Sequence, residues 1–256
     1  MHFYQVIIGT EILNRRRNDK HFLFLSEELL KRGEKLHASF VIEDDPELIA
    51  KTFELVKSDP EAVLFSFGGI GSTPDDLTRE IAAKVFTGKP LQVHEEAKRR
   101  ILAQFGQEAY PHRIHMAELP ENAGLLDNPV NNVPGFSIAN RYSFVPGFPQ
   151  MAHPMVRRAL DTLLPDAQPA FRRTFTALTS ENELITMMQQ VPEAVEFSSL
   201  PAFCGDKRIA VISLSGKEEA LVEAWYTRFV DYMKAHGIAW VEGDHHDDPD
   251  LCRPDD

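Results

Sequence analysis

A glycine-rich turn between an apolar strand and a helix constrains this chain more than any other feature. Residues 62–67 are apolar and are typical of a strand buried on both faces of a parallel sheet. The turn Gly68-Gly69-Ile70-Gly71 follows, and residues 77–86 then have the pattern of a helix. Such a turn presents bare backbone N–H groups at a helix start, where they can hold a phosphate. The sequence therefore predicts an anion site formed by Gly68, Gly69, Gly71, Ser72, Thr73 and Thr78.

Two aspartates, Asp75 and Asp76, stand at the mouth of this turn. A carboxylate beside a phosphate is repulsive unless a cation lies between them, so the pair predicts a divalent metal, Mg²⁺ above all. Asp76 is the first choice as a catalytic and metal-binding residue, with Asp75 assisting. The alternative is that Asp76 only caps the helix and Asp75 is a solvated acid of its first turn.

The first 165 residues alternate strands and helices. Strands are predicted at 3–8, 36–42 and 62–67, and helices at 21–32, 44–58, 77–86, 95–105 and 155–164. This alternation predicts an α/β domain whose parallel sheet is covered on both faces and binds ligands at the carboxyl ends of its strands. Residues 107–150 are rich in proline and glycine, with a hairpin predicted at 136–145. A long irregular stretch of this kind is more often functional than idle.

A second, smaller domain is predicted after a boundary at 165–169. Strands are predicted at 171–178, 195–200, 208–214 and 238–241, and helices at 181–190 and 217–236. This order is the split βαβ arrangement, over residues 170–242. The acidic tail at 243–256 is predicted to be disordered.

Composition excludes several classes of protein. The net charge of −12 argues against a non-specific nucleic-acid binder. Two cysteines, Cys204 and Cys252, provide no disulfide framework, which fits a reducing compartment. The first strand lacks the features of a signal peptide, and no apolar stretch is long enough to span a bilayer. We therefore expect a cytoplasmic protein without a membrane partner.

Several motifs resemble one known family. The turn with Asp75-Asp76-Leu77-Thr78 resembles the signature of the MoaB/Mog molybdopterin-binding domain. Four further segments resemble its CinA-like branch: Gly9-Thr10-Glu11-Ile12-Leu13, Asp44-Asp45-Pro46, Asn128-Pro129 with Pro134-Gly135-Phe136, and Pro146-Gly147-Phe148-Pro149. The resemblance implies a three-layer α/β/α domain with a mostly parallel sheet in residues 1–165, followed by a small α+β domain. The deamidase domain of full-length CinA proteins has no counterpart here, so deamidation of nicotinamide mononucleotide is not expected.

The chain also departs from the family pattern. Arg15, Arg16 and Arg17 stand where the family has small or polar residues and glycine. Asn131 stands where glycine is common, and Met151 stands near the place of an acid. The arginines could clamp a second phosphate, or they could form a solvated basic loop or an interface.

The resemblance also implies roles for residues outside the turn. The aspartate at the position of Asp76 is functionally critical in the family, and the segment of Asp19 approaches the ligand, which makes Asp19 a second catalytic candidate. Asp19 could equally cap the helix at 21–32. Glu11 ends the first strand, where it could hold a metal or a pterin-like ring, or pair with the arginines. Pro146 and Gly147 are predicted to form a rigid turn beside the ligand, or a purely structural one.

These features lead to one prediction of function and two alternatives. The ligand would carry a phosphate or pyrophosphate joined to a flat heterocycle, either molybdopterin or an adenine nucleotide. CinA-like domains are associated with metal-dependent hydrolysis of nucleotide pyrophosphates such as ADP-ribose, and we predict that activity with Mg²⁺ or another divalent metal. The alternatives are molybdopterin binding or adenylylation in molybdenum cofactor biosynthesis, and a non-catalytic binding protein. The resemblance also predicts a homo-oligomer.

Overall fold

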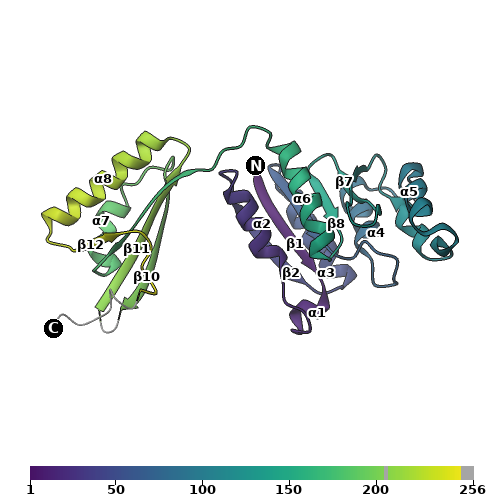
Figure 1. The fold of residues 1–256 in the computed structure, drawn as a ribbon, viewed down its shortest axis with the longest axis horizontal. Helices are drawn as coiled ribbons and strands as arrows, with labels where there is room; N and C mark the ends of the chain where they lie inside the picture. The colour runs from purple at the N-terminus through teal and green to yellow at the C-terminus, as the bar shows by residue number, and fades with distance from the viewer. Residues whose placement is uncertain (205–206, 249–256) are drawn as a thin grey trace. The chain divides into compact units, whose positions relative to one another are not determined.

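The chain forms two compact units, Met1–Ala167 and Gln168–Asp256. The structure is a computed structural model that describes residues 1–204 and 207–248 (Figure 1). The division falls within residues 165–169, the segment in which the sequence predicts a boundary. Each unit has a hydrophobic core of its own.

The first unit contains a six-stranded sheet in the order β2-β1-β3-β8-β7-β6. Four neighbouring strands are parallel: β2 (Leu36–Ile42), β1 (His2–Ile8), β3 (Ala62–Phe67) and β8 (Tyr142–Val145). The last two, β7 (Gly135–Ile138) and β6 (Gly124–Leu126), are antiparallel to their neighbours. The prediction of a mostly parallel sheet is confirmed, and every residue of β3 is buried.

Helices cover both faces of this sheet (Figure 1). One core cluster includes Phe3, Ile7 and Phe65, and α2 (His21–Leu30) and α6 (Pro149–Leu163) pack on it. The opposite cluster includes Tyr4, Val6 and Leu64 and is covered by α3 (Pro46–Ser58), α4 (Thr78–Ala82), the π-helical turn Ala83–Thr87 and α5 (Glu95–Phe105). Alternate residues of each strand thus supply opposite layers, which gives the predicted α/β/α architecture.

Short elements complete the first unit. They are α1 (Thr10–Leu13), two 3₁₀ turns at Gly106–Ala109 and Arg113–Ala117, and a two-stranded ribbon of β4 (Gln92–Val93) and β5 (Glu118–Leu119).

The ends of two helices show how local sequence sets them. Asp45 accepts a hydrogen bond from the Leu48 amide at 2.7 Å, with Pro46 in the first turn, so α3 starts where its capping signal predicts. By contrast, α6 begins at Pro149, six residues before the predicted start. Pro149 occupies the first turn, where a missing N–H costs nothing, and Pro154 is accommodated inside the helix. The predicted rigid turn at 146–149 therefore leads directly into a helix.

The second unit contains a four-stranded antiparallel sheet in the order β10-β11-β9-β12. Its elements are β9 (Phe171–Ala177), the 3₁₀ turn Glu181–Glu183, α7 (Ile185–Met188), β10 (Glu196–Cys204), β11 (Lys207–Gly216), α8 (Glu219–Ala235) and β12 (Trp240–Glu242). This is the split βαβ order, although the helix predicted at 181–190 is reduced to a 3₁₀ turn and one helical turn.

The start of the tail is held against the second sheet. Disorder is predicted from residue 243 onward, whereas the Gly243 amide donates to the Thr174 carbonyl at 2.8 Å and the His245 amide to Thr176 Oγ1 at 3.0 Å. These hydrogen bonds extend the pairing of β9 with β12 beyond Glu242. The acidic composition of the tail gives no sign of this pairing. Residues 249–256 of the predicted tail lie outside the described part of the chain.

Candidate anion-binding site

The glycine turn after β3 has a backbone conformation that only glycine adopts easily. Gly68 and Gly69 have φ angles of +99° and +68°. A Cβ atom on Gly68 would lie 2.4 Å from the Ile8 carbonyl oxygen, and one on Gly69 would lie 2.2 Å from Thr78 Oγ1. The chain can therefore pass this close to β1 and to the start of α4 only without side chains.

Four successive carbonyl groups of the turn are bound on one side by two residues of α4. Thr78 Oγ1 donates to the Gly68 carbonyl at 3.1 Å, and the Thr78 amide donates to the Gly69 carbonyl at 3.0 Å. Arg79 Nη1 donates to the carbonyls of Ile70 and Gly71. Thr78 is fully buried and Arg79 is 9% exposed. Thr78, predicted as a ligand contact, instead supports the turn from behind.

This arrangement directs backbone N–H groups away from α4. In a trans peptide the N–H points opposite to the carbonyl of the preceding residue, so the amides of residues 69–72 face away from Thr78 and Arg79. Within residues 1–204 and 207–248, none of these four amides donates a hydrogen bond to protein. The same four residues line a cavity of about 420 Å³. A row of unpaired amides at a cavity is the arrangement from which anion-binding concavities are built.

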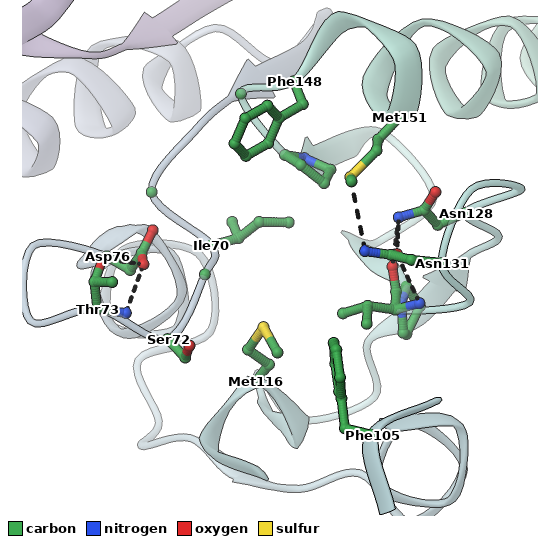
Figure 2. A pocket seen from close by; sticks show the side chains of 16 residues that line it. Ile70, Ser72, Thr73, Asp76, Phe105, Met116, Asn128, Asn131, Phe148 and Met151 are labelled. Carbon is green, nitrogen blue, oxygen red and sulfur yellow. Dashed lines mark hydrogen bonds between the residues drawn. The ribbon is translucent and has the colours of Figure 1, made fainter. Parts of the chain in front are cut away.

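The rest of the cavity wall is mostly apolar (Figure 2). Phe105, Met116, Val133, Phe148 and Met151 line it. Pro146 and Gly147 also line the cavity, and a Cβ on Gly147 would be 3.5 Å from the Cα atom of Gly68. A polar row of amides beside an apolar wall suits a ligand with an anionic group joined to a flat ring.

Asp76 is the carboxylate that reaches the cavity. Its Oδ2 accepts hydrogen bonds from the Thr73 amide at 2.8 Å and from Thr73 Oγ1 at 2.6 Å (Figure 2). Because α4 begins at Thr78 without a side-chain cap, Asp76 does not cap that helix. In the described part of the chain, Asp76 Oδ1 has no hydrogen-bond partner, which leaves it available to a cation.

Asp75 is placed differently. Its side chain is exposed and does not line the cavity, and the nearby Thr73 hydroxyl lowers its pKa. The two aspartates therefore do not both face the cavity, and the amide and hydroxyl of Thr73 bind Asp76.

Arg79 is the residue that sequence reasoning missed. Burial lowers the pKa of its guanidinium, while the nearby Asp76 carboxylate opposes that shift. A hydropathy pattern cannot predict that an arginine is buried and binds two carbonyls, because arginine side chains are ordinarily exposed. Its position directly after the turn was the only available signal.

Asp19 does not line the cavity. Its Oδ1 accepts a hydrogen bond from the His21 amide at 2.7 Å, and its Oδ2 accepts one from the Phe22 amide at 3.1 Å. Both oxygens thus bind the first turn of α2, which is the capping alternative.

Glu11 also stays outside the cavity. Its carboxylate lies 3.6 Å from Arg17 Nη1, and the Arg17 guanidinium lies over the Phe148 ring at 5.1 Å. Arg17 is therefore the member of the arginine cluster that approaches the cavity wall, and Arg15 and Arg16 line none of it.

Two histidines behind the cavity form a second feature that the sequence did not reveal. His21 is 3% exposed, its Nε2 lies 3.3 Å from the Gly147 carbonyl oxygen, and its ring stacks on Phe67. His153 stacks on Phe24 with 3.6 Å between ring centroids. Burial lowers the pKa of both imidazoles, that of His153 to about 4.

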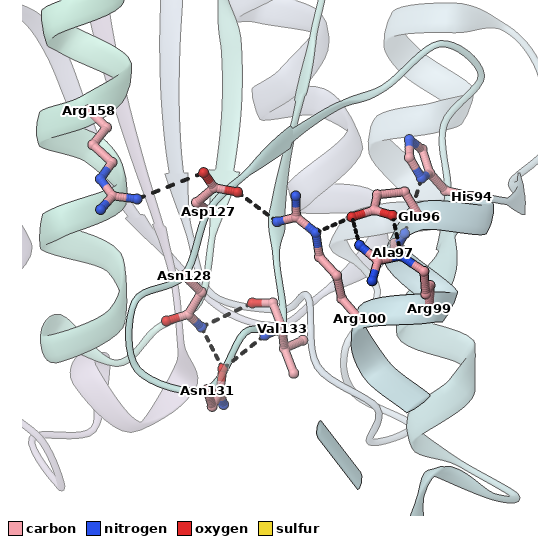
Figure 3. Close-up of polar contacts among 10 residues, drawn as sticks. All are labelled: His94, Glu96, Ala97, Arg99, Arg100, Asp127, Asn128, Asn131, Val133 and Arg158. Carbon is pink, nitrogen blue, oxygen red and sulfur yellow. Dashed lines mark hydrogen bonds and ion pairs between the residues drawn. The ribbon is translucent and has the colours of Figure 1, made fainter. Parts of the chain in front are cut away.

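The two positions that depart from the family pattern in this region contact each other. Asn131 Nδ2 lies 3.9 Å from Met151 Sδ (Figure 2). Asn131 Oδ1 accepts a hydrogen bond from Asn128 Nδ2 at 2.7 Å (Figure 3). Next to them, Asp127 binds Arg100 Nη1 at 2.6 Å and lies 3.8 Å from Arg158 Nη1. These contacts join the segment 127–133 to α5 and α6.

Comparison with known proteins identifies the family. The model of the family described as "Probable molybdopterin binding domain" matches residues 5–234. The chain belongs to this family. Among its relatives, a CinA-like protein of Geotalea uraniireducens is 30% identical over 250 residues, which cover 92% of this chain and 59% of that protein. A CinA-like protein of Fusobacterium nucleatum is 32% identical over 145 residues, or 56% of this chain and 35% of that protein.

A solved structure supports the same assignment for the fold. CinA from Thermoplasma acidophilum, described as having unknown function, is 28% identical with a TM-score of 0.58 and covers 64% of this chain and 97% of that one. The family match at residues 5–234 reaches into the second unit, and the chain spans only about a third to three fifths of the two CinA-like relatives. None of the helices in the described residues is long and apolar enough to cross a membrane.

Proposed function

We propose that the cavity binds a nucleotide pyrophosphate such as ADP-ribose and that the protein hydrolyses it with the help of a divalent metal. The support is the row of four unpaired amides at residues 69–72, which faces a cavity whose other wall is apolar. The amides would hold a phosphate and stabilise charge that develops on its oxygens, and the apolar wall would hold the base.

Asp76 fits the metal that such a reaction uses. Its Oδ1 is unpaired among the described residues, and carboxylate oxygens are the ligands that Mg²⁺ prefers. A single carboxylate is sufficient, because protein-bound Mg²⁺ usually keeps several waters and completes its shell with substrate phosphates. The ion would neutralise phosphate charge, while Thr73 fixes the orientation of the carboxylate and Arg79 fixes the turn.

The test is release of AMP from ADP-ribose in the presence of Mg²⁺, Mn²⁺ or Co²⁺. Asp76→Asn should lower turnover by at least about 100-fold, because it removes the anionic ligand at the cavity. Asp75→Asn is the matched control and should leave turnover nearly unchanged, since Asp75 does not line the cavity. Equal loss in the two variants, or an inactive wild-type protein with all three metals, would refute the hydrolase proposal.

Molybdopterin binding or adenylylation is the second candidate, favoured by the shape of the cavity wall. Phe105, Met116 and Met151 form an apolar surface that suits a flat pterin as well as an adenine. Tight binding of a pterin phosphate without ADP-ribose turnover would support this candidate. We further propose, from the resemblance, that the chain forms a homo-oligomer, which sedimentation analysis tests.

A further inference from the structure

A cluster of two histidines and one aspartate lies at the opposite end of the parallel strands from the glycine turn. His2 opens β1, His37 is the second residue of β2, and Asp59 lies between α3 and β3. These are the amino ends of the strands, whereas the glycine turn follows the carboxyl end of β3. In the part of the chain that the structure describes, this is the one group of three or more potential metal ligands that converges.

A β-bulge in β2 brings His37 into the cluster. Phe3 pairs with Leu36 and Tyr4 pairs with Ala38, so His37 is an extra residue with no partner in the register. As a result, Leu36 packs on one face of the sheet and Ala38 on the other. The His37 ring stacks on the His2 ring with centroids 4.5 Å apart and lies 5.1 Å from the Tyr4 ring.

The carboxylate of Asp59 is held in place by its neighbours. Its Oδ1 accepts a hydrogen bond from the Glu61 amide at 2.8 Å, and its Oδ2 accepts one from the Tyr4 hydroxyl at 2.9 Å. Oδ2 also lies 2.7 Å from His2 Nδ1. Metal-binding carboxylates typically have such supporting hydrogen bonds, which fix the direction of the ligand oxygen.

We propose that His2, His37 and Asp59 form a binding site for a divalent transition-metal ion of the zinc type. Two imidazoles and one carboxylate are a common ligand set for zinc, with a water in the fourth position. The same set disfavours Mg²⁺, which prefers oxygen ligands, so this site and the Asp76 site call for different ions.

The geometry allows the ion to enter with a small side-chain adjustment. One donor atom from each residue lies within 4.8 Å of the other two. In a tetrahedral zinc site with bonds of about 2.1 Å, donor atoms are about 3.4 Å apart. The His2 and His37 rings are exposed and can turn, while the partly buried Asp59 keeps its orientation. Binding would replace the hydrogen bond between His2 and Asp59 with two metal bonds.

The experiment uses the full chain without any affinity tag. Zn²⁺ is titrated by calorimetry, and Co²⁺ is used as a probe because its absorption reports tetrahedral nitrogen and oxygen ligation. The wild-type protein should bind one ion at this site. His37→Ala should weaken Zn²⁺ binding on the order of 100-fold, because it removes a direct ligand that lies on the surface and does not support the core.

Two controls separate this site from other histidines. His236→Ala changes an exposed histidine of the second unit and should not alter binding. The double variant His245→Ala/His246→Ala removes the histidines that pair with Asp244, Asp247 and Asp248, and it should also keep the site. The proposal is overturned if wild-type protein binds no Zn²⁺, if His37→Ala binds as tightly as wild type, or if only the double variant loses the ion. Because the assay measures metal binding, its result is independent of ADP-ribose hydrolysis.

Discussion

Two segments at the same edge of the parallel sheet illustrate how similar sequence signals lead to different structures. Residues 68–73 follow β3, and residues 9–19 follow the neighbouring strand β1. Both begin with glycine, both contain or precede acidic residues, and both were predicted to contact a ligand. The first segment leaves four amides unpaired at a cavity, whereas the second uses its polar groups on itself and its neighbours.

The polar groups of the second segment are paired with other groups of the protein. Thr10 donates to Asp44 Oδ2 through both its amide and its hydroxyl, each at 2.9 Å. The Arg17 amide donates to the Glu11 carbonyl at 2.9 Å, and Asp19 binds the first turn of α2. Asp19 therefore has both carboxylate oxygens bound, whereas Asp76 keeps one oxygen without a partner among the described residues.

Replacing the first glycine of each segment should give the largest contrast. Gly68→Ala would place a Cβ 2.4 Å from a backbone oxygen at a φ of +99°, so we expect unfolding free energy to fall by about 2–4 kcal/mol. Gly9→Ala is the control: its φ of 172° is extended, and its Cβ would meet only the movable Glu11 carboxylate. Urea denaturation measures both, and equal losses would contradict our account of the turn.

Acidification should destabilise the folded protein through the histidines His21 and His153, which lie behind the second segment. The folded protein keeps the pKa of His153 at about 4, below the ordinary 6.5, so the unfolded chain takes up a proton first as the pH falls. The contribution of His153 to the free energy of unfolding is therefore fully present above pH 6.5. It declines between pH 6.5 and 4, by on the order of 2 kcal/mol after allowing for the partial exposure of the ring.

His153→Gln should flatten this part of the pH profile, measured by urea denaturation at pH 7 and pH 5. The exposed His236→Gln serves as the control and should retain the wild-type slope. Identical slopes in His153→Gln and wild type would show that this imidazole is not the group responsible. Glu28 affects stability at lower pH. Hydrogen bonds from Lys31, Arg32 and Arg157 lower its pKa to about 2, so its contribution to the unfolding free energy is lost only below pH 4.5.

Removing the carboxylate of Asp19 should cost stability and leave binding intact. Asp19→Ala deletes the acceptor for the His21 and Phe22 amides, so we expect a loss of about 1 kcal/mol, typical of a helix cap. Turnover or affinity per folded molecule should not change, because Asp19 does not line the cavity. A selective loss of activity with unchanged stability would instead support the catalytic role that the family resemblance implies.

The smallest effect is expected for the ion pair between Glu11 and Arg17. The two groups lie 3.6 Å apart with side chains about two fifths exposed. Glu11→Gln should therefore change the unfolding free energy by less than about 0.5 kcal/mol. Thermal denaturation at low and high salt measures it, and a shift of several degrees would mean that the pair has a larger structural role than its exposure indicates.

The sequence by itself determined most of the secondary structure and the position of the glycine turn. Apolar runs, capping residues such as Asp45 and the proline-rich boundary act over a few residues, so a linear pattern contains them. The β-α-β-β-α-β order of elements in the second unit can also be seen in the sequence, because each element has its own local pattern.

Only the tertiary structure decided which polar groups are free. Arg79 binds carbonyls of the turn, Thr78 supports it from behind, and Asp19 is consumed by a helix. His37 reaches His2 and Asp59 because a bulge and three separate elements bring them together. The physical reason is that a residue's type sets which hydrogen-bond donors and acceptors it carries. Its neighbours in the fold determine which of these groups are already paired and which remain free to bind a ligand.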